Sequence, residues 1–279
     1  MGVNANFLPE IGRQYASILR STLPYPLIGA DVRIVTTEEL KNMLEQRQKI
    51  LKPPADNSYI WRYYPLENFL SLLTSNQLLF AKASSFEDPY EGDYGAAAKQ
   101  RIREKYGDGQ YLRDFNTFEF LREHTYISCW HENEHESDAM WKLYGNAIAV
   151  KAKYSSIRNL LSWSETEVKH SGRVNYIDYA TEHINVDSSY LPYFFKRISF
   201  AHEREVRFLI QEHRYDWNEY PVPAVPCKTA QLKINADLDE FVLSPTMKPY
   251  VANAIEQIVR QAGIEIPVRR STLLNRPVW

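Results

Sequence analysis

The chain has very little cysteine, with only Cys129 and Cys227 among its 279 residues. Two cysteines cannot supply the several cross-links of a small secreted domain, which excludes a disulfide scaffold. We therefore expect a reducing, cytoplasmic environment. The first ten residues also lack a basic stretch followed by an apolar one, so no signal peptide is expected.

Glycine is scarce as well, with ten residues in the whole chain. None of them forms a Gly-x-x-x-x-Gly-Lys loop, a Gly-x-Gly-x-x-Gly fingerprint or a Gly-x-Ser-x-Gly elbow. These absences argue against a P-loop nucleotidase, a Rossmann dinucleotide site and a serine hydrolase of the α/β type. A nucleotide site in this chain would have to bind the phosphates without a glycine-rich loop.

Long apolar runs and an excess of either charge are also absent. No window approaches 18 apolar residues, so we expect no membrane span and no membrane partner. The net charge of -2 argues against a broad nucleic-acid-binding surface. The chain is 44% apolar and 24% charged, which are ordinary values for a globular protein.

Hydrophobic periodicity and turn residues predict short strands mixed irregularly with helices. This pattern favours an α+β fold with a mixed, mainly antiparallel sheet and flanking helices. Residues 1–56 are predicted to be an N-terminal helical extension, and residues 57–279 a single α+β domain. Strands are expected at 59–64, 77–81, 126–130, 147–151, 173–177, 200–210, 238–244 and 266–271. Helices are expected at 36–51, 66–75, 137–144, 155–162, 190–197 and 249–262, with a further helical region at 93–124.

The segment Phe200–Ile210 carries the strongest signal for chemistry. If it is a strand, Glu203, Glu205 and Arg207 share one face, with the carboxylates roughly 7 Å apart. Such a pair can hold a ribose hydroxyl, accept a proton or stabilise an oxocarbenium-like transition state. Arg207 is the expected local partner that keeps one carboxylate ionised by lowering its pKa. Alternatively, the segment is an exposed edge strand of the sheet, or it is a helix in which Glu203 and Arg207 form an i,i+4 ion pair.

Arg62 and Ser128 are candidate binding residues on two other predicted strands. The guanidinium of Arg62 suits a phosphate or pyrophosphate, although a structural pairing with aromatic or acidic neighbours is the commoner role for an arginine in such a position. Ser128 is expected to point away from Ile127 and Cys129 and to bond a ligand or a carboxylate.

Two further groups of residues support a metal-site alternative. The turn-rich loop Phe86–Glu91 places Glu87, Asp88 and Glu91 together, but it also reads as a rigid Asp-Pro turn. His124, Cys129, His131 and His135 cluster in sequence, yet they match no established zinc spacing. We therefore expect no metal.

Several segments together resemble one bacterial family, the domain-of-unknown-function family numbered 2971. The resemblance rests, in order, on residues 61–70, 78–91, 127–130, 140–144 and 202–208, and it spans residues 58–272. The loop of that family usually reads Asn-Asp-Pro, where this chain has Glu87-Asp88-Pro89. The family label implies no activity.

The order of these strands is also similar to the layout of ADP-ribosyltransferases, which split NAD at the nicotinamide–ribose bond. That resemblance implies an NAD-consuming transferase or glycohydrolase, with NAD as substrate and a protein or nucleic acid as acceptor. It further suggests an effector in phage defence. Glu205 would be the catalytic glutamate with Glu203 beside it, and Arg62 would hold the phosphates.

The same resemblance assigns supporting roles around the cofactor. Ser128 would support the ribose, and Tyr63 or Trp130 would stack on nicotinamide. The Ser-Thr-Ser triplet of that group of enzymes is absent. Two other functions remain open, namely a non-catalytic nucleotide- or protein-binding module and a metal-dependent hydrolase.

Overall fold

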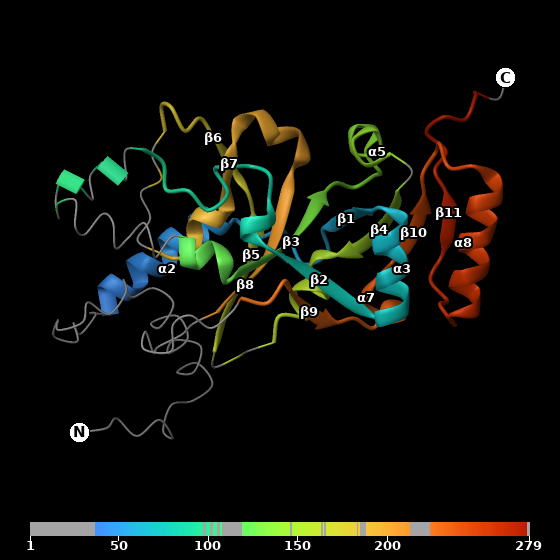
Figure 1. The fold of residues 1–279 in the computed structure, drawn as a ribbon, viewed down its shortest axis with the longest axis horizontal. Coiled ribbons are helices and arrows are strands. Elements are labelled where there is room, and N and C mark those ends of the chain that lie inside the picture. Colours follow the sequence, from blue (N-terminus) through green and yellow to red (C-terminus); the bar gives the residue numbers. More distant parts are fainter. Residues whose placement is uncertain are drawn as a thin grey trace.

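The computed structural model is organised around one large sheet (Figure 1). The structure describes residues 37–96, 99–100, 103–104, 107, 119–145, 147–162, 164, 166–182, 184, 188–212 and 224–277. The expectations for residues 1–36 and for most of 93–118 lie outside these residues. In the described part of the chain, no helix is both long and apolar enough to cross a bilayer.

Nine strands form the main sheet and two short ones form a second, parallel pair. The strands are β1 (Tyr59–Tyr64), β2 (Gln77–Lys82), β3 (Thr125–Glu132), β4 (Ile148–Lys153), β5 (Glu167–Arg173), β6 (Asn175–Ile177), β7 (Phe195–Arg197), β8 (Glu205–Glu212), β9 (Cys227–Gln231), β10 (Glu240–Leu243) and β11 (Val268–Arg270). All neighbours in the main sheet are antiparallel except β10 and β11. The expected α+β class with a mainly antiparallel mixed sheet is confirmed.

Helices lie on both faces of the sheet. They are α2 (Thr37–Leu51), α3 (Leu66–Ser75), α5 (Asp138–Tyr144), α6 (Tyr154–Arg158), α7 (Ile234–Asp237) and α8 (Pro249–Gln261), with the 3-10 turns η2 (Ala83–Ser85), η3 (Leu191–Phe194) and η4 (Ile198–Glu203). The α3 and α8 helices share a core with Val206, Phe208 and Ile210 of β8. The opposite face packs against α2, η3 and α5.

The sheet forks at β3, and this fork positions the candidate site. One edge of β3 pairs with β8 over its whole length. The other edge is shared, because β1 pairs only at Trp61 and its neighbour Ile60, while β2 pairs only at Ala81 and Lys82. Between these two pairings, β1 and β2 diverge from one another. We call this place the fork.

Most predicted elements are present within one or two residues of their expected bounds. Two regions differ. The strand β5 was not expected, since Glu167–Arg173 mixes charged residues with a glycine and lacks a β-branched run. The expected helix at 190–197 is wrong, because the segment is a single 3-10 turn, η3, followed by β7. Pro192 inside this segment limits helix propagation.

The packing of α2 against β5 depends on Gly172. A Cβ added there would lie less than 3.0 Å from three main-chain atoms of Leu51. Since backbone cannot move aside as a side chain can, Gly172→Ala is expected to lower the free energy of unfolding by about 1–3 kcal/mol. Gly263→Ala is the control, because a Cβ there meets nothing within 4 Å and only its positive φ opposes it. Urea unfolding of both variants measures the difference, and equal losses would contradict this packing account.

A cluster of one lysine and two glutamates links β9 to β5 and β8. Lys228 pairs with Glu167 and, at 2.8 Å, with Glu212. Burial alone would raise the pKa of both carboxyls, but Lys228 and nearby donors lower it below the ordinary 4.5. A carboxyl with a lowered folded pKa stabilises the fold above its unfolded pKa, and this stability is lost as pH falls.

The chain should therefore lose stability below about pH 4.5 through this cluster. In Lys228→Met the two carboxyls lose their main partner, so the acid-unfolding midpoint is expected to move to higher pH. Far-UV circular dichroism against pH measures this midpoint. An unchanged midpoint would show that the cluster does not contribute.

Candidate functional site

The centre of the site is a buried arginine whose five N–H donors are all used. Arg207 lies on β8 with no exposed surface. Its Nε donates to Glu205 at 2.9 Å and its Nη2 donates to Glu205 at 3.1 Å. The other contacts are Nη1 to Glu91 at 2.5 Å, Nη2 to Glu91 at 3.0 Å and Nη1 to the carbonyl of Tyr193 at 2.5 Å. A guanidinium clamped by two bidentate carboxylates has a fixed orientation.

The two carboxyls of this network have opposite pKa shifts. Burial raises the pKa of Glu205, but Arg207 and Lys196 outweigh burial, and the pKa is lowered overall. Burial also raises the pKa of Glu91, and there Arg207 does not fully compensate. Glu205 is therefore held ionised, while Glu91 is the first of the two to take a proton. The expected pairing of Arg207 with one of the two carboxylates is present, and the partner is Glu205.

Glu203 does not lie on the strand, which corrects the expectation that it shares a face with Glu205 and Arg207. It belongs to η4, and the next residue, Arg204, has a φ of 42° that breaks the chain direction before β8 begins. The two glutamates nevertheless meet at one cation. Lys196 on β7 forms an ion pair with Glu203 and lies 3.5 Å from Glu205.

The accessibility of these two glutamates differs. Glu205 keeps 5% of its side chain exposed and has both oxygens engaged by Arg207. Glu203 is 18% exposed, and only its Oε2 has a partner within the described residues. Glu205 thus anchors the network, and Glu203 presents a carboxylate oxygen to solvent.

Arg62 and Ser128 lie on the opposite face of the sheet from Glu205. Alternation places Arg62 between Ile60 and Tyr64, which belong to the core with α3 and α8. The Nη1 atom of Arg62 donates to Ser128 Oγ at 2.6 Å and to the carbonyl of Leu79 at 3.0 Å. These contacts place the guanidinium at the fork, between β1, β2 and β3.

Trp130 is a core residue rather than a ring open to a ligand. It is 2% exposed, packs edge to face against Phe208 and donates its Nε1 hydrogen to Ser128 Oγ at 3.0 Å. Ser128 therefore accepts from both Arg62 and Trp130, and it points away from Ile127 and Cys129 as expected.

Tyr63 is buried beneath a second tyrosine that the sequence did not single out. Its hydroxyl accepts from the backbone N–H of Ser137 at 2.9 Å, and its ring meets Trp141 edge to face. Tyr144, the last residue of α5, stacks on Tyr63 with 6.0 Å between ring centroids and 14° between planes. Tyr144 is 44% exposed, so it offers the ring face that was expected from Tyr63.

Tyr144 also connects the two halves of the candidate site. Burial is the main reason its hydroxyl pKa is raised, and the negative charges of Glu203 and Glu205 raise it further. The positive charge of Arg62 acts on the same hydroxyl in the opposite direction. The charges of Arg62 and of the two glutamates therefore act on one hydroxyl, although their strands present them on different faces.

Two of the histidines and two acids of the Asp-Pro loop have structural partners. His124 pairs with Glu212 at 2.6 Å, and His131 donates its Nδ1 hydrogen to the carbonyl of Glu203. Asp88 pairs with Arg197, and Glu91 is clamped by Arg207. Among the residues with defined positions, no three His, Cys, Asp or Glu side chains gather as metal ligands would.

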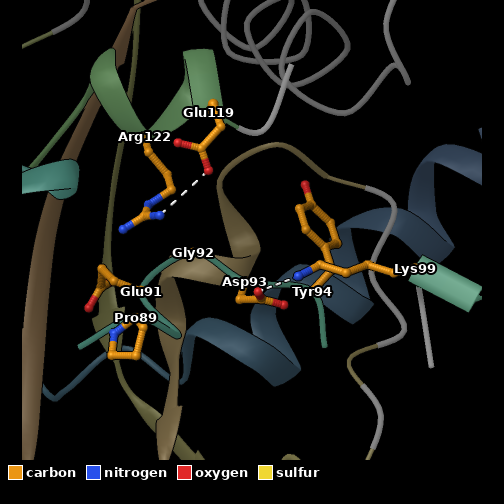
Figure 2. A pocket seen from close by; sticks show the side chains of 8 residues that line it. All are labelled: Pro89, Glu91, Gly92, Asp93, Tyr94, Lys99, Glu119 and Arg122. Atoms are coloured by element: carbon orange, nitrogen blue, oxygen red, sulfur yellow. Dashed lines mark hydrogen bonds and ion pairs between the residues drawn. The ribbon is translucent and has the colours of Figure 1, made fainter. Parts of the chain in front are cut away.

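A small hollow lies between the 89–95 turn and two helical residues, Glu119 and Arg122, as Figure 2 shows. Its lining includes Glu91, and the two ion pairs at its rim are Lys99 with Asp93 and Arg122 with Glu119. Its volume of about 40 Å³ suits one or two waters rather than a nucleotide.

Sequence reasoning missed Tyr144 and Lys196. Tyr144 is the last residue of the segment Met140–Tyr144, on which part of the family resemblance rests. The resemblance could therefore have pointed to it. Lys196 had no local signal, because its two glutamate partners meet it only through the turn of η4.

Comparisons of the chain with protein-family models, with curated proteins and with solved structures found no match.

Proposed function

We propose that the chain consumes NAD, as a transferase or glycohydrolase of the ADP-ribosyltransferase type, with its substrate bound at the fork. The observation that carries this proposal is that the charges of Arg62, Glu203 and Glu205 all act on the hydroxyl of Tyr144, whose side chain is 44% exposed. An exposed aromatic ring with a cation and two carboxylates near it matches the three parts of the substrate. These parts are the nicotinamide ring, the pyrophosphate and the ribose.

Arg62 would bind the pyrophosphate. Its Nη1 atom is occupied by Ser128 and Leu79, but Nε and Nη2 make no hydrogen bond within the described part of the chain. Two donors on one side of a planar guanidinium suit a phosphate oxygen pair. The contacts to Ser128 and Leu79 fix the guanidinium before substrate arrives, which reduces the entropy lost on binding.

Glu203 would face the ribose and stabilise positive charge as the nicotinamide bond loosens. Oxocarbenium-like transition states are stabilised by a nearby carboxylate. Glu205 has no free oxygen for this task, so its proposed role is to hold Lys196, which in turn positions Glu203. Tyr144 would stack on the nicotinamide ring.

Replacement of Arg62 tests phosphate binding. In Arg62→Gln, loss of a charge-assisted contact is expected to raise the KM for NAD by about 10- to 100-fold, with a smaller effect on kcat. Steady-state NAD consumption measures both constants. Ser128→Ala is the matched control, because it removes an anchor of Arg62 but no phosphate donor. An unchanged KM in Arg62→Gln would contradict the assignment.

A second function, a non-catalytic nucleotide-binding module, is favoured by one observation. Both oxygens of Glu205 are hydrogen-bonded to Arg207 and its side chain is only 5% exposed, so the glutamate expected to be catalytic is held inside the network. Calorimetric titration with NAD, followed by product analysis of the same sample, separates the two functions. Saturable heat without nicotinamide release would support the module.

A further inference from the structure

Exposed apolar side chains gather at the end of the molecule formed by α8 and β11. In the described part of the chain, four of the ten strongly exposed large hydrophobic side chains belong to α8 or to the segment after β11. They are Tyr250 at 69%, Ile258 at 40%, Leu273 at 43% and Leu274 at 62% exposed. Figure 1 shows α8 beside β11 at this end, away from α2 and the β6–β7 pair. An exposed apolar patch often marks a contact with another molecule.

The fold itself uses only the other side of α8. That buried side is formed by Ala252, Ile255 and Val259. These three belong to the core that α8 shares with the sheet. Tyr250, Ala254 and Ile258 follow each other at intervals of four residues, so they lie along one stripe on the outer side of the helix. The outer stripe is therefore free to contact a partner.

The outer side of α8 carries no charge, although 24% of the chain is charged. Gln257 and Gln261 lie beside the stripe, and both are exposed and neutral. The two charged residues of the helix are on the flank next to β11. Glu256 pairs there with Arg270, and Arg260 donates to the carbonyl of Glu256 at 3.1 Å. A tyrosine in a patch without charge is typical of the centre of a protein–protein interface.

A face without charge suits a second copy of the same chain. In a two-fold symmetric contact the same patch meets itself, so a charge near the axis would oppose a like charge. A charged partner, by contrast, would find no opposite charge to pair with on this face. Charge therefore favours self-association over a basic or an acidic partner.

The sizes of the side chains along the stripe also fit a second copy. They alternate between large and small in the order Tyr250, Ala254, Ile258 and, just after the helix, Ala262. Residues four apart form the ridges that interlock when two helices pack. An antiparallel pair with its axis midway between Ala254 and Ile258 sets Ile258 against the partner subunit's Ala254. The same axis sets Tyr250 against the partner subunit's Ala262, so each large side chain meets a small one.

From these observations we propose that the outer face of α8 is the contact surface of a symmetric dimer, in which a second copy packs its own α8 antiparallel to the first. A helix of 13 residues is about 20 Å long, which gives a small interface. The dissociation constant is therefore expected at about 1–100 μM. This surface is separate from the fork, and it does not depend on the NAD proposal.

Sedimentation velocity of the full chain, from about 1 to 500 μM, measures the association. Wild type is expected to shift from monomer to dimer within this range. Ile258→Glu brings unpaired charge into the contact and should weaken the association at least about 100-fold. Ile198→Glu is the matched control, because it places the same charge on another exposed isoleucine, in η4. It should associate as wild type does, and both variants should unfold near the wild-type temperature when dilute.

An exchange of volumes tests the antiparallel register. Ala254→Ile alone sets isoleucine against isoleucine and should weaken the dimer by about tenfold. Adding Ile258→Ala restores a large side chain against a small one, so the double variant should associate as wild type does.

Three results would each overturn the proposal. The first is a chain that stays monomeric over the whole range, which would leave the face to a different partner. The second is a dimer that Ile258→Glu does not weaken. The third is tighter association of Ala254→Ile, because a non-specific apolar patch gains from added surface and an interlocked contact does not. Since NAD is absent from these measurements, failure here is distinct from failure at the fork.

Discussion

Arg207→Met is expected to lower the free energy of unfolding by about 3–5 kcal/mol at neutral pH. The substitution leaves Glu205 and Glu91 buried with their shared cation removed. Lys196 still lies 3.5 Å from Glu205, but no ion pair to Glu91 remains among the described residues. A buried carboxylate without a partner must either take a proton or open the structure to water. Urea unfolding monitored by tryptophan fluorescence measures the loss.

Two further variants show whether buried charge is the cause. Arg204→Met changes the neighbouring exposed arginine, and it is expected to cost less than about 0.5 kcal/mol. Adding Glu91→Gln and Glu205→Gln to Arg207→Met removes both stranded charges and should recover part of the stability. If the triple variant were as unstable as the single one, lost packing rather than unpaired charge would explain the effect.

Glu203→Gln is expected to reduce NAD turnover by about 100- to 1000-fold while leaving the fold intact. Glutamine keeps the size of the side chain but carries no negative charge to oppose the developing cation. Because Glu203 is 18% exposed and has a single cationic partner, the thermal unfolding temperature should change little. Initial rates of NAD loss at saturating substrate measure the effect on kcat.

Glu265→Gln is the control, since Glu265 is exposed and lies in the loop between α8 and β11. Its rate should equal that of wild type. The variant Glu205→Gln should lose both activity and stability, because Glu205 anchors Arg207 and Lys196. Wild-type turnover in Glu203→Gln would remove Glu203 from the mechanism.

Local pattern was enough to predict most of the fold. The β-prone composition of Tyr59–Tyr64 and the apolar stripe of Leu66–Ser75 predicted β1 and α3 at their observed bounds. Ser137 was expected to cap α5, and its side chain does accept from Met140 N. These elements follow local preference because capping and periodicity are properties of neighbouring residues.

The candidate site was less predictable, for two physical reasons. Arg204 adopts a positive φ, which arginine rarely does, so nothing in its identity signals the break that moves Glu203 off the strand. In addition, Glu91 reaches Arg207 across 116 residues of sequence, and such pairing depends on sheet topology rather than spacing. The short-range pair of Glu205 with Arg207 was predictable because both lie on one strand face.

The fork explains why residues on opposite faces of the sheet belong to one proposed site. Where β1 and β2 separate, the guanidinium of Arg62 lies between strands instead of above one face. The charges of Arg62 and of the two glutamates act on the hydroxyl of Tyr144.

Release of nicotinamide from NAD by the purified wild-type chain tests the central claim most directly. The account predicts that nicotinamide accumulates as NAD disappears, at a rate that saturates with NAD concentration and falls about 100- to 1000-fold in Glu203→Gln. Liquid chromatography of timed samples measures both species. Saturable NAD binding with no nicotinamide release, or no interaction with NAD at all, would contradict it.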